Sequence, residues 1–276
     1  MIKDYIYDSS SEHFSESEDS FIERHWSDIW RGKELNLGVL NETIQNRAEL
    51  AIMQKYLQAA GKNTKILDAG CGLGNWTAYF ALKGYDVTGM DISKEVIQRL
   101  QTRGVPGVYK HGDVRKTGFS DNQFDFCFSW GVFEHFESGP DECFKEAFRI
   151  LKPGGFLFAS VPYQNLRHAR KNNRIIRQAE KNTFYSKGYS EKCGRFYQWR
   201  LSESELYQQA SLAGFQTKNI HRLDKREGVK RILVNFCSSP HENKISRFAV
   251  TWLLGVLLPS RWVSHMIMVV AQKPIM

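Results

Sequence analysis

A glycine-rich loop directly after a short apolar segment carries the strongest chemical signal in the sequence. The run Ile66-Leu67-Asp68-Ala69-Gly70-Cys71-Gly72-Leu73-Gly74 places three glycines at alternate positions. Glycine adopts backbone angles that other residues avoid, and its missing side chain lets a ligand touch the main chain. Such a loop between a strand and a helix lies where ligands bind in parallel sheets. The pattern predicts a small-molecule binding loop; the alternative is an ordinary tight turn.

Asp91 is the second candidate, 21 residues after Gly70 and at the end of the next apolar segment. A carboxylate at this place can accept hydrogen bonds from both hydroxyls of a ribose, and a spacing of about 20 residues is typical of that role. The alternative is the N-cap of the following helix, for which Ser93 is also a candidate. The two roles can be divided between the two side chains.

The same two features also occur in enzymes that bind a nicotinamide dinucleotide. In those proteins the glycines follow a G-x-G-x-x-G spacing, and the pyrophosphate rests on the helix N-terminus. Here the spacing is G-x-G-x-G, and Asn75 stands at the position of the third dinucleotide glycine. This disfavours a nicotinamide-dependent oxidoreductase, which stays an alternative. A non-catalytic binding protein is a further alternative, disfavoured because Asp68, Asp91 and Asp113 are all present.

Five motifs in order give the chain a family resemblance. They are DAGCGLG (68–74), GMDIS (89–93), GDV (112–114), FDFCFSWGVFEH (124–135) and LKPGG (151–155). With them the chain resembles the class I S-adenosylmethionine-dependent methyltransferases, over about residues 60–162 and more loosely over 200–276. The resemblance implies S-adenosyl-L-methionine as cofactor. It also implies a doubly wound α/β fold whose mostly parallel, seven-stranded sheet has the order 3-2-1-4-5-7-6, with the seventh strand antiparallel and helices on both faces.

The resemblance further implies roles for individual residues. Ten of them would contact the cofactor: Asp68, Gly70, Cys71, Gly72, Ser129 and Trp130 at the methionine end, Asp91 at the ribose, and Ile92, Asp113 and Val114 at the adenine. Taken from the residues alone, Asp113 could equally be a turn aspartate and Trp130 an ordinary core residue.

Transfer of a methyl group to a hydroxyl or a protonated amine needs a base that removes a proton. His135, just past the fourth expected strand, has a suitable position and residue type. The alternative is a structural Glu134–His135 pair at a helix start. His168 and Tyr163 are further candidates for the base. No third ligand accompanies Glu134 and His135, so no metal site is predicted.

Alternating strands and helices are expected to position these residues. The expected strands are 65–69, 86–91, 108–111, 124–129, 156–161, 216–223 and 265–272, and the expected helices include 76–83, 94–103 and 141–151. This alternation predicts a parallel sheet covered on both faces. Ser202 to Glu205 form a capping box that opens one more helix. An apolar helix at 241–258, expected to be mostly core, lies between the last two strands.

Two regions outside this pattern define the predicted domain organisation. Residues 1–60 are expected to be an N-terminal extension, with a solvated or disordered stretch at 8–20 followed by helices that cover the cofactor site. The first helix has apolar residues near helical spacing, namely Phe21, Ile22, Trp26, Ile29 and Trp30, and a second is expected at 44–60. Residues 61–276 are the expected methyltransferase domain, with 163–200 inserted after strand five.

The net charge of +8 is unevenly distributed. Residues 1–60 carry −5, whereas 163–200 carry +8 together with seven aromatic residues. The insertion is either a solvated charged lid or a pocket for an anionic or aromatic small-molecule acceptor. In a pocket, a carboxylate or phosphate would meet arginines from the set Arg167, Arg170, Arg174, Arg177 and Arg195. RNA and a lipid-linked acceptor are the remaining alternatives; the acidic N-terminus disfavours RNA.

The predicted function is therefore methyl transfer to a small-molecule acceptor, most simply through oxygen or nitrogen. Five scattered cysteines without a CxxC pair and no signal-like N-terminus predict a reducing, cytoplasmic location. The longest apolar run, 248–258, is shorter than the roughly 20 residues that a membrane span requires. The sequence leaves open the acceptor, the acceptor atom and the oligomeric state.

Overall fold

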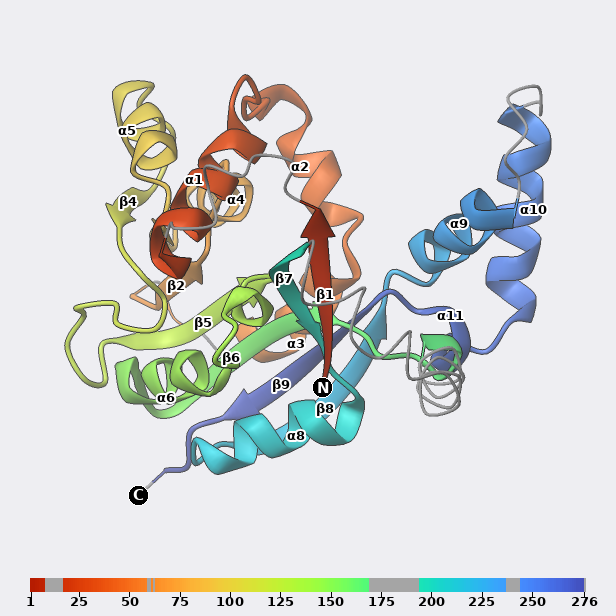
Figure 1. The fold of residues 1–276 in the computed structure, drawn as a ribbon. Helices are drawn as coiled ribbons and strands as arrows, with labels where there is room; N and C mark the ends of the chain where they lie inside the picture. The colour runs from red at the N-terminus through yellow and green to blue at the C-terminus, as the bar shows by residue number, and fades with distance from the viewer. Residues whose placement is uncertain (8–16, 59–60, 62, 169–193, 237–243, 276) are drawn as a thin grey trace.

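A seven-stranded sheet forms the centre of the computed structural model, which describes residues 1–7, 17–58, 61, 63–168, 194–236 and 244–275 (Figure 1). Its strands are β2 (Lys65–Ala69), β3 (Asp86–Asp91), β4 (Val108–His111), β5 (Phe124–Trp130), β6 (Leu151–Pro162), β8 (Gln216–Leu223) and β9 (Met266–Gln272). Their order is β4-β3-β2-β5-β6-β9-β8. Pairs from β4 to β6 are parallel, and β9 is antiparallel to both of its neighbours. The predicted α/β sheet and its strand order are confirmed.

Apolar side chains on both faces of the sheet form two buried layers. In β5, Phe126 and Phe128 lie in one layer and Cys127 in the other, as expected for a period of two along a strand. One layer includes side chains of α6 (Asp141–Ile150) and α8 (Glu203–Leu212). The other includes α3 (Ala48–Leu57) and α4 (Asn75–Leu82). Burial on both faces keeps the carboxyl ends of the central strands in a fixed relation.

The predicted helix starts are largely met. Ser93 caps α5 (Lys94–Thr102), accepting from the Val96 N–H at 3.3 Å. At α8, Ser202 and Glu205 form the predicted capping box, with the Ser202 N–H 2.8 Å from the Glu205 carboxylate. Strand β6 differs from the prediction, because it begins at Leu151 and not at Phe156, and it includes Pro153, Gly154 and Gly155. Leu151 already pairs with Phe124 of β5.

The N-terminal region is divided differently from the prediction. It holds α1 (Glu18–Trp30), α2 (Leu37–Gln45) and α3; the helix expected over 44–60 corresponds to α3, which is shorter than expected, and α2 was not predicted. The chain turns between α2 and α3, where Asn46 is the C-cap of one helix and Arg47 the N-cap of the next. Of the stretch expected to be solvated, residues 8–16 lie outside the described residues, and 18–20 form the first turn of α1.

A second, two-stranded sheet was not predicted. It pairs β1 (Ile2–Tyr7) with β7 (Gly194–Arg200) in antiparallel register, with Ile2 opposite Arg200. The Asp4 carboxylate in β1 pairs with the Arg200 guanidinium at 2.7 Å. In β7, the Trp199 indole N–H donates to the Phe136 carbonyl at 3.0 Å, which joins this sheet to the loop after β5. The later end of the inserted region is therefore tied to the N-terminus.

Between β8 and β9 the chain forms three helices, α9 (Lys225–Phe236), α10 (Lys244–Leu257) and α11 (Ser260–Val263). In Figure 1, α9 and α10 project from the body. The expectation that the apolar helix is mostly core is wrong for its described side chains: Trp252, Leu253, Val256 and Leu257 are 50–66% exposed. No helix of the described residues is long and apolar enough to cross a membrane.

Candidate functional site

The glycine loop follows β2 with a backbone that other residues would strain. Gly70, Gly72 and Gly74 have φ values of 88°, 49° and 75°, in the left-handed region that glycine enters at little cost. A Cβ atom at Gly70 would lie 2.3 Å from Cγ2 of Val132, in the loop after β5. Glycine is therefore required at position 70 for two reasons, the positive φ and the close approach of Val132.

Asp68 and Ser129 hold the glycine loop in place through buried hydrogen bonds. Asp68 is 2% exposed, and its Oδ2 accepts from the Thr77 amide at 3.1 Å and from the Thr77 hydroxyl at 2.7 Å. Burial raises the pKa of Asp68 to about 7, against the lowering effect of those hydrogen bonds. The Ser129 hydroxyl donates to the Ala69 carbonyl at 2.9 Å. Both side chains hold β2, α4 and β5 together and do not line the pocket described next.

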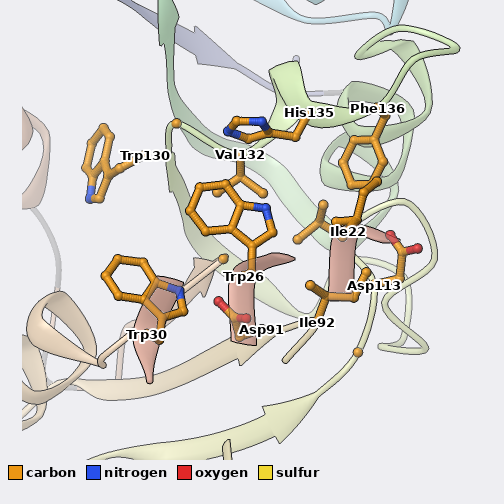
Figure 2. Close-up of a pocket in the computed structure, with 14 residues that line it drawn as sticks. Ile22, Trp26, Trp30, Asp91, Ile92, Asp113, Trp130, Val132, His135 and Phe136 are labelled. Atoms are coloured by element: carbon orange, nitrogen blue, oxygen red, sulfur yellow. The ribbon is translucent and has the colours of Figure 1, made fainter. Parts of the chain in front are cut away.

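A pocket opens above the loop, at the carboxyl ends of β2, β3 and β5 (Figure 2). Its cavity volume is about 240 Å³. Of the residues predicted from the sequence, seven line it: Gly70, Asp91, Ile92, Asp113, Val114, Trp130 and His135. The predicted contacts Cys71 and Gly72 do not line it. The Cys71 thiol instead lies against Gly89 of β3, 3.1 Å from the place of a Cβ there.

Asp91 stands between the glycine loop and α5. Its carboxylate accepts from the Gly72 N–H at 2.8 Å and from the Ser93 N–H at 2.9 Å. Burial raises its pKa above the ordinary value, although these hydrogen bonds act in the opposite direction. Because Ser93 caps α5, Asp91 is not needed as the cap. Each carboxylate oxygen can accept more than one hydrogen bond, so capacity remains for ligand hydroxyls.

Asp113 reaches the pocket from the loop after β4, but it is also half of an ion pair. The Arg115 guanidinium donates to both of its oxygens, at 3.0 and 2.6 Å on one oxygen and 3.2 Å on the other. Arg115 also binds Asp19 in the first turn of α1. These contacts fix the adenine-facing wall predicted for Asp113 and attach α1 to it.

Helix α1 covers the pocket with aromatic side chains that the sequence reasoning did not assign to the site. Ile22, Trp26 and Trp30 line it, and Figure 2 shows the two indoles across its middle. Trp30 lies against the glycine loop, since a Cβ at Gly72 would be 3.0 Å from its ring. The Trp30 carbonyl accepts from Arg99 of α5 at 3.0 Å. Two tryptophans four residues apart, on one face of a helix, were the signal available in the sequence.

His135 forms part of the opposite wall, at the end of the short helix η2 (Phe133–His135). Its Nδ1 lies 2.7 Å from the Tyr197 carbonyl oxygen. A carbonyl oxygen can only accept, so Nδ1 carries the proton of the neutral ring and Nε2 carries the lone pair. Burial lowers the pKa of His135 to about 4, although the bond to Tyr197 acts in the opposite direction. The imidazole is therefore neutral at pH 7.

Glu134 is buried beside His135 but does not form an ion pair with it. Burial raises the pKa of Glu134 to about 8, so at pH 7 both side chains are mostly neutral. The Glu134 Oε1 and His135 Nε2 atoms are 3.8 Å apart, too far for a hydrogen bond. The described residues hold no cluster of three or more side chains able to bind a metal ion.

The other predicted residues lie away from this pocket or outside the described residues. The Tyr163 hydroxyl donates to Glu203 at 3.0 Å. Arg167 and His168 line a second cavity. Arg170, Arg174 and Arg177 fall in 169–193, which is not described, and the side chain of Arg195 is not described either.

Comparison with known proteins relates the site to a family. Residues 67–159 match a family model described as a methyltransferase domain. The chain is 28% identical over 131 residues to a malonyl-[acyl-carrier protein] O-methyltransferase from Pectobacterium atrosepticum, covering 44% of this chain and 51% of that protein. It is 30% identical over 151 residues to a 2-methyl-6-phytyl-1,4-hydroquinone methyltransferase from Synechocystis, covering 51% and 46%. The matches thus span about half the length of these relatives.

A solved structure shows the same fold. An S-adenosylmethionine-dependent methyltransferase from Methanosarcina mazei superposes with a TM-score of 0.55 at 21% identity, over 82% of this chain and 98% of that one. The matched segment 67–159 contains the glycine loop, β3, β5 and η2. It does not contain α1, which supplies one wall of the pocket here, or β7, whose Tyr197 carbonyl holds His135.

Proposed function

Since residues 67–159 are a class I S-adenosylmethionine-dependent methyltransferase domain, we propose that the protein transfers a methyl group from S-adenosylmethionine to an oxygen or nitrogen atom of a small-molecule acceptor. The observation that carries the proposal is the position of Asp91. Its carboxylate lies at the end of β3, bonded to the glycine loop and facing the pocket. A ribose bound there would meet a fixed acceptor of hydrogen bonds.

The other pocket residues fit the same cofactor. Ile92 and Val114 supply apolar walls beside Asp113 for a flat ring system. At the opposite end, the buried indole N–H of Trp130 makes no hydrogen bond within the structure, and a buried donor is costly to leave unpaired. It is available to a polar group of the ligand. Asp68 and Ser129 act indirectly, by holding the loop against β5.

The cofactor supplies a methyl group on a sulfonium, which is already an activated leaving group. The protein's task is to orient the acceptor and exclude water, and orientation can contribute several kcal/mol of a barrier, up to about 7–11 kcal/mol in the best cases. Trp26 and Trp30 cover the pocket and keep water out. His135, with its lone pair on Nε2, is the proposed base that takes the proton of the acceptor hydroxyl or ammonium.

Calorimetric titration with S-adenosylhomocysteine tests the proposed cofactor site, with NAD as the control ligand. Asp91→Asn should weaken S-adenosylhomocysteine binding by about tenfold or more, since a hydrogen bond to a charged group contributes roughly 1.5–3 kcal/mol. Asp86→Asn, at the exposed opposite end of the same strand, should leave binding unchanged. Tight NAD binding, or equal affinities in the two variants, would reject the assignment.

A lipid-linked acceptor is the second candidate, and the exposed apolar side chains of α10 favour it. An exposed apolar helix face is a feature of proteins that bind at membrane surfaces. Methyl transfer to extracted lipid-linked compounds, but not to their water-soluble head groups, would select this candidate. Transfer to water-soluble acceptors alone would reject it.

A further inference from the structure

A second cavity is lined largely by basic side chains. Its walls include Arg167, His168, Arg200, Arg231 and His265. His265 immediately precedes β9, whose Met266 pairs with Pro162 at the carboxyl end of β6. The cavity therefore opens at the same edge of the sheet as the cofactor pocket. It is formed by the short stretch after β6, the end of β7 and the start of α9.

Two guanidinium groups in this cavity have donors that no described residue satisfies. Arg167 Nε and Arg200 Nη1 are both buried and make no hydrogen bond within the structure. Arginine does not lose its proton in proteins, so these N–H groups remain donors at every relevant pH. Leaving a buried donor unpaired costs about 1–3 kcal/mol, and more when the group is charged. A ligand with acceptor oxygens would remove this cost.

His168 adds a third unpaired donor. The Arg167 Nη2 lies 3.3 Å from His168 Nε2, and because arginine can only donate, Nε2 is the accepting nitrogen. The proton of the neutral ring is then on Nδ1, which is buried without a partner. Burial, and then the charges of Arg200 and Arg167, lower the pKa of His168 to about 4. The imidazole is therefore a neutral donor beside two positive charges.

One carboxylate, Glu227, lines the cavity together with four basic side chains, Arg167, Arg200, Lys230 and Arg231, so its positive charge is not balanced. Asp4 pairs with Arg200 through Nε, on the other side of the guanidinium from the unpaired Nη1. Glu227 pairs with Arg231 at 3.2 Å and with Lys230 at 3.7 Å. Arg167 forms no ion pair with any described residue. An unbalanced, partly buried cluster with several unpaired donors is the arrangement that binds carboxylate or phosphate oxygens.

The cavity is joined to the proposed base through β7. Arg200 ends this strand, and three residues earlier Tyr197 holds His135 through its carbonyl. The Tyr197 and His135 rings are in edge contact, with centroids 5.1 Å apart. Arg200, which lines the cavity, and Tyr197, which positions His135, are therefore three residues apart on one strand.

We infer that the second cavity binds an oxyanion, a phosphate or a carboxylate, that belongs to the methyl acceptor, with Arg167 and Arg200 as its main partners. The identity of the ligand as the acceptor rests on the proposed function; the binding of an oxyanion does not. This makes the acceptor an acidic small molecule whose methylated atom lies some distance from its anionic group.

Inorganic phosphate is the first probe, titrated into the full-length protein by calorimetry at constant ionic strength with chloride as the control. Arg167→Gln should weaken phosphate binding about tenfold or more, because it removes a charged donor. Lys218→Gln, an exposed lysine on β8 away from the cavity, should bind phosphate as the wild type does. Wild-type protein that binds phosphate no better than chloride, or equal affinity in both variants, would overturn the inference.

Three further measurements separate this inference from the proposed function. S-adenosylhomocysteine should bind Arg167→Gln as it binds the wild type, and phosphate should bind Asp91→Asn as it binds the wild type. If the wild type binds phosphate but not S-adenosylhomocysteine, the cofactor assignment is rejected and the oxyanion site is retained. If it binds S-adenosylhomocysteine but not phosphate, the oxyanion site is rejected and the cofactor assignment is retained. Competition of phenyl phosphate or of benzoate against phosphate then distinguishes a phosphoryl acceptor from a carboxylate acceptor. If neither compound competes with phosphate, the link between the cavity and the acceptor is overturned.

Discussion

The Nδ1 atom of His135 donates to the Tyr197 carbonyl across 2.7 Å, from the helix after β5 to a strand 62 residues later in the chain. This one hydrogen bond selects the tautomer of the imidazole and its orientation. It makes the geometry of the proposed base depend on the small β1–β7 sheet, which lies outside the segment that matches the methyltransferase family model.

His135→Gln should lower kcat by roughly 10²–10⁴-fold, the usual contribution of a positioned general base. S-adenosylhomocysteine affinity should stay within about twofold, because the ring is a wall of the pocket and not a proposed cofactor ligand. Methyl transfer from labelled S-adenosylmethionine to an acceptor found by screening acidic small molecules provides the measurement. His221→Gln, in β8, is the matched control.

The pH profile checks the same residue independently. With a pKa of about 4, His135 stays unprotonated through the neutral range, so the acid limb of kcat in the wild type should lie well below pH 6. An acid limb near 6.5, or a variant that keeps its kcat, would exclude His135 as the base.

Glu134→Gln should change the dependence of stability on pH. The pKa of Glu134 is about 8 in the folded protein against an ordinary value of 4.5, so the folded state binds more protons between these values. The stability that this group contributes is complete below about pH 4.5 and is lost as the pH rises through 8. Glutamine stays neutral throughout, so the variant should gain stability relative to the wild type between pH 5 and 8.5.

The gain in the free energy of unfolding should be on the order of a few kcal/mol, since each pKa unit corresponds to about 1.4 kcal/mol. Urea unfolding at pH 5 and at pH 8.5 measures it. Glu95→Gln, on the exposed side of α5, serves as the control and should show no such gain. A constant difference between Glu134→Gln and wild type across this range would show that Glu134 is ionised in the folded protein.

Gly70→Ala should remove cofactor binding, whereas Gly84→Ala should not. Both glycines have φ near 87° (88° and 86°), so alanine strains the backbone at either position, at a cost of about 1–2 kcal/mol. Only at Gly70 would the new Cβ collide, 2.3 Å from Val132, whereas at Gly84 it would meet nothing within 4 Å. Thermal unfolding and S-adenosylhomocysteine titration measure the two effects.

Adding Val132→Ala to Gly70→Ala should restore part of the lost stability, because it removes the colliding methyl groups. If Gly70→Ala and Gly84→Ala lose the same stability and both bind the cofactor, the close approach of the two loops has no functional role.

The sheet could be predicted because its determinants are local. Each strand is a short apolar run, each helix has its own start and stop signals, and the family motifs supply the order. The division of roles between Asp91 and Ser93 was also within reach, because both were candidates for the cap and the structure assigns it to Ser93. The same reasoning identified seven residues that line the pocket.

The parts that were missed depend on partners distant in sequence. Nothing near residues 2–7 indicates a strand partner at 194–200, and a two-stranded sheet is stable only with such a partner and a surface to pack on. The helices of the N-terminal extension were expected to cover the cofactor site, but the spacing of the tryptophans in α1 does not tell which side chains line the pocket. The basic cavity joins residues near 167, 200, 231 and 265, which no local pattern connects.

The pairing of β1 with β7 also has a consequence for how the molecule assembles. All the strands from β2 to β6 lie within residues 65–162, whereas Ile2 finds its partner only at Arg200. The entropic cost of closing a loop rises with its length, and contacts between distant residues form slowly. We therefore expect the parallel strands β2 to β6 to pair first and the small sheet to join last. A folding chain would thus form the glycine loop and the end of β3 before it is able to orient the imidazole of His135, the proposed base.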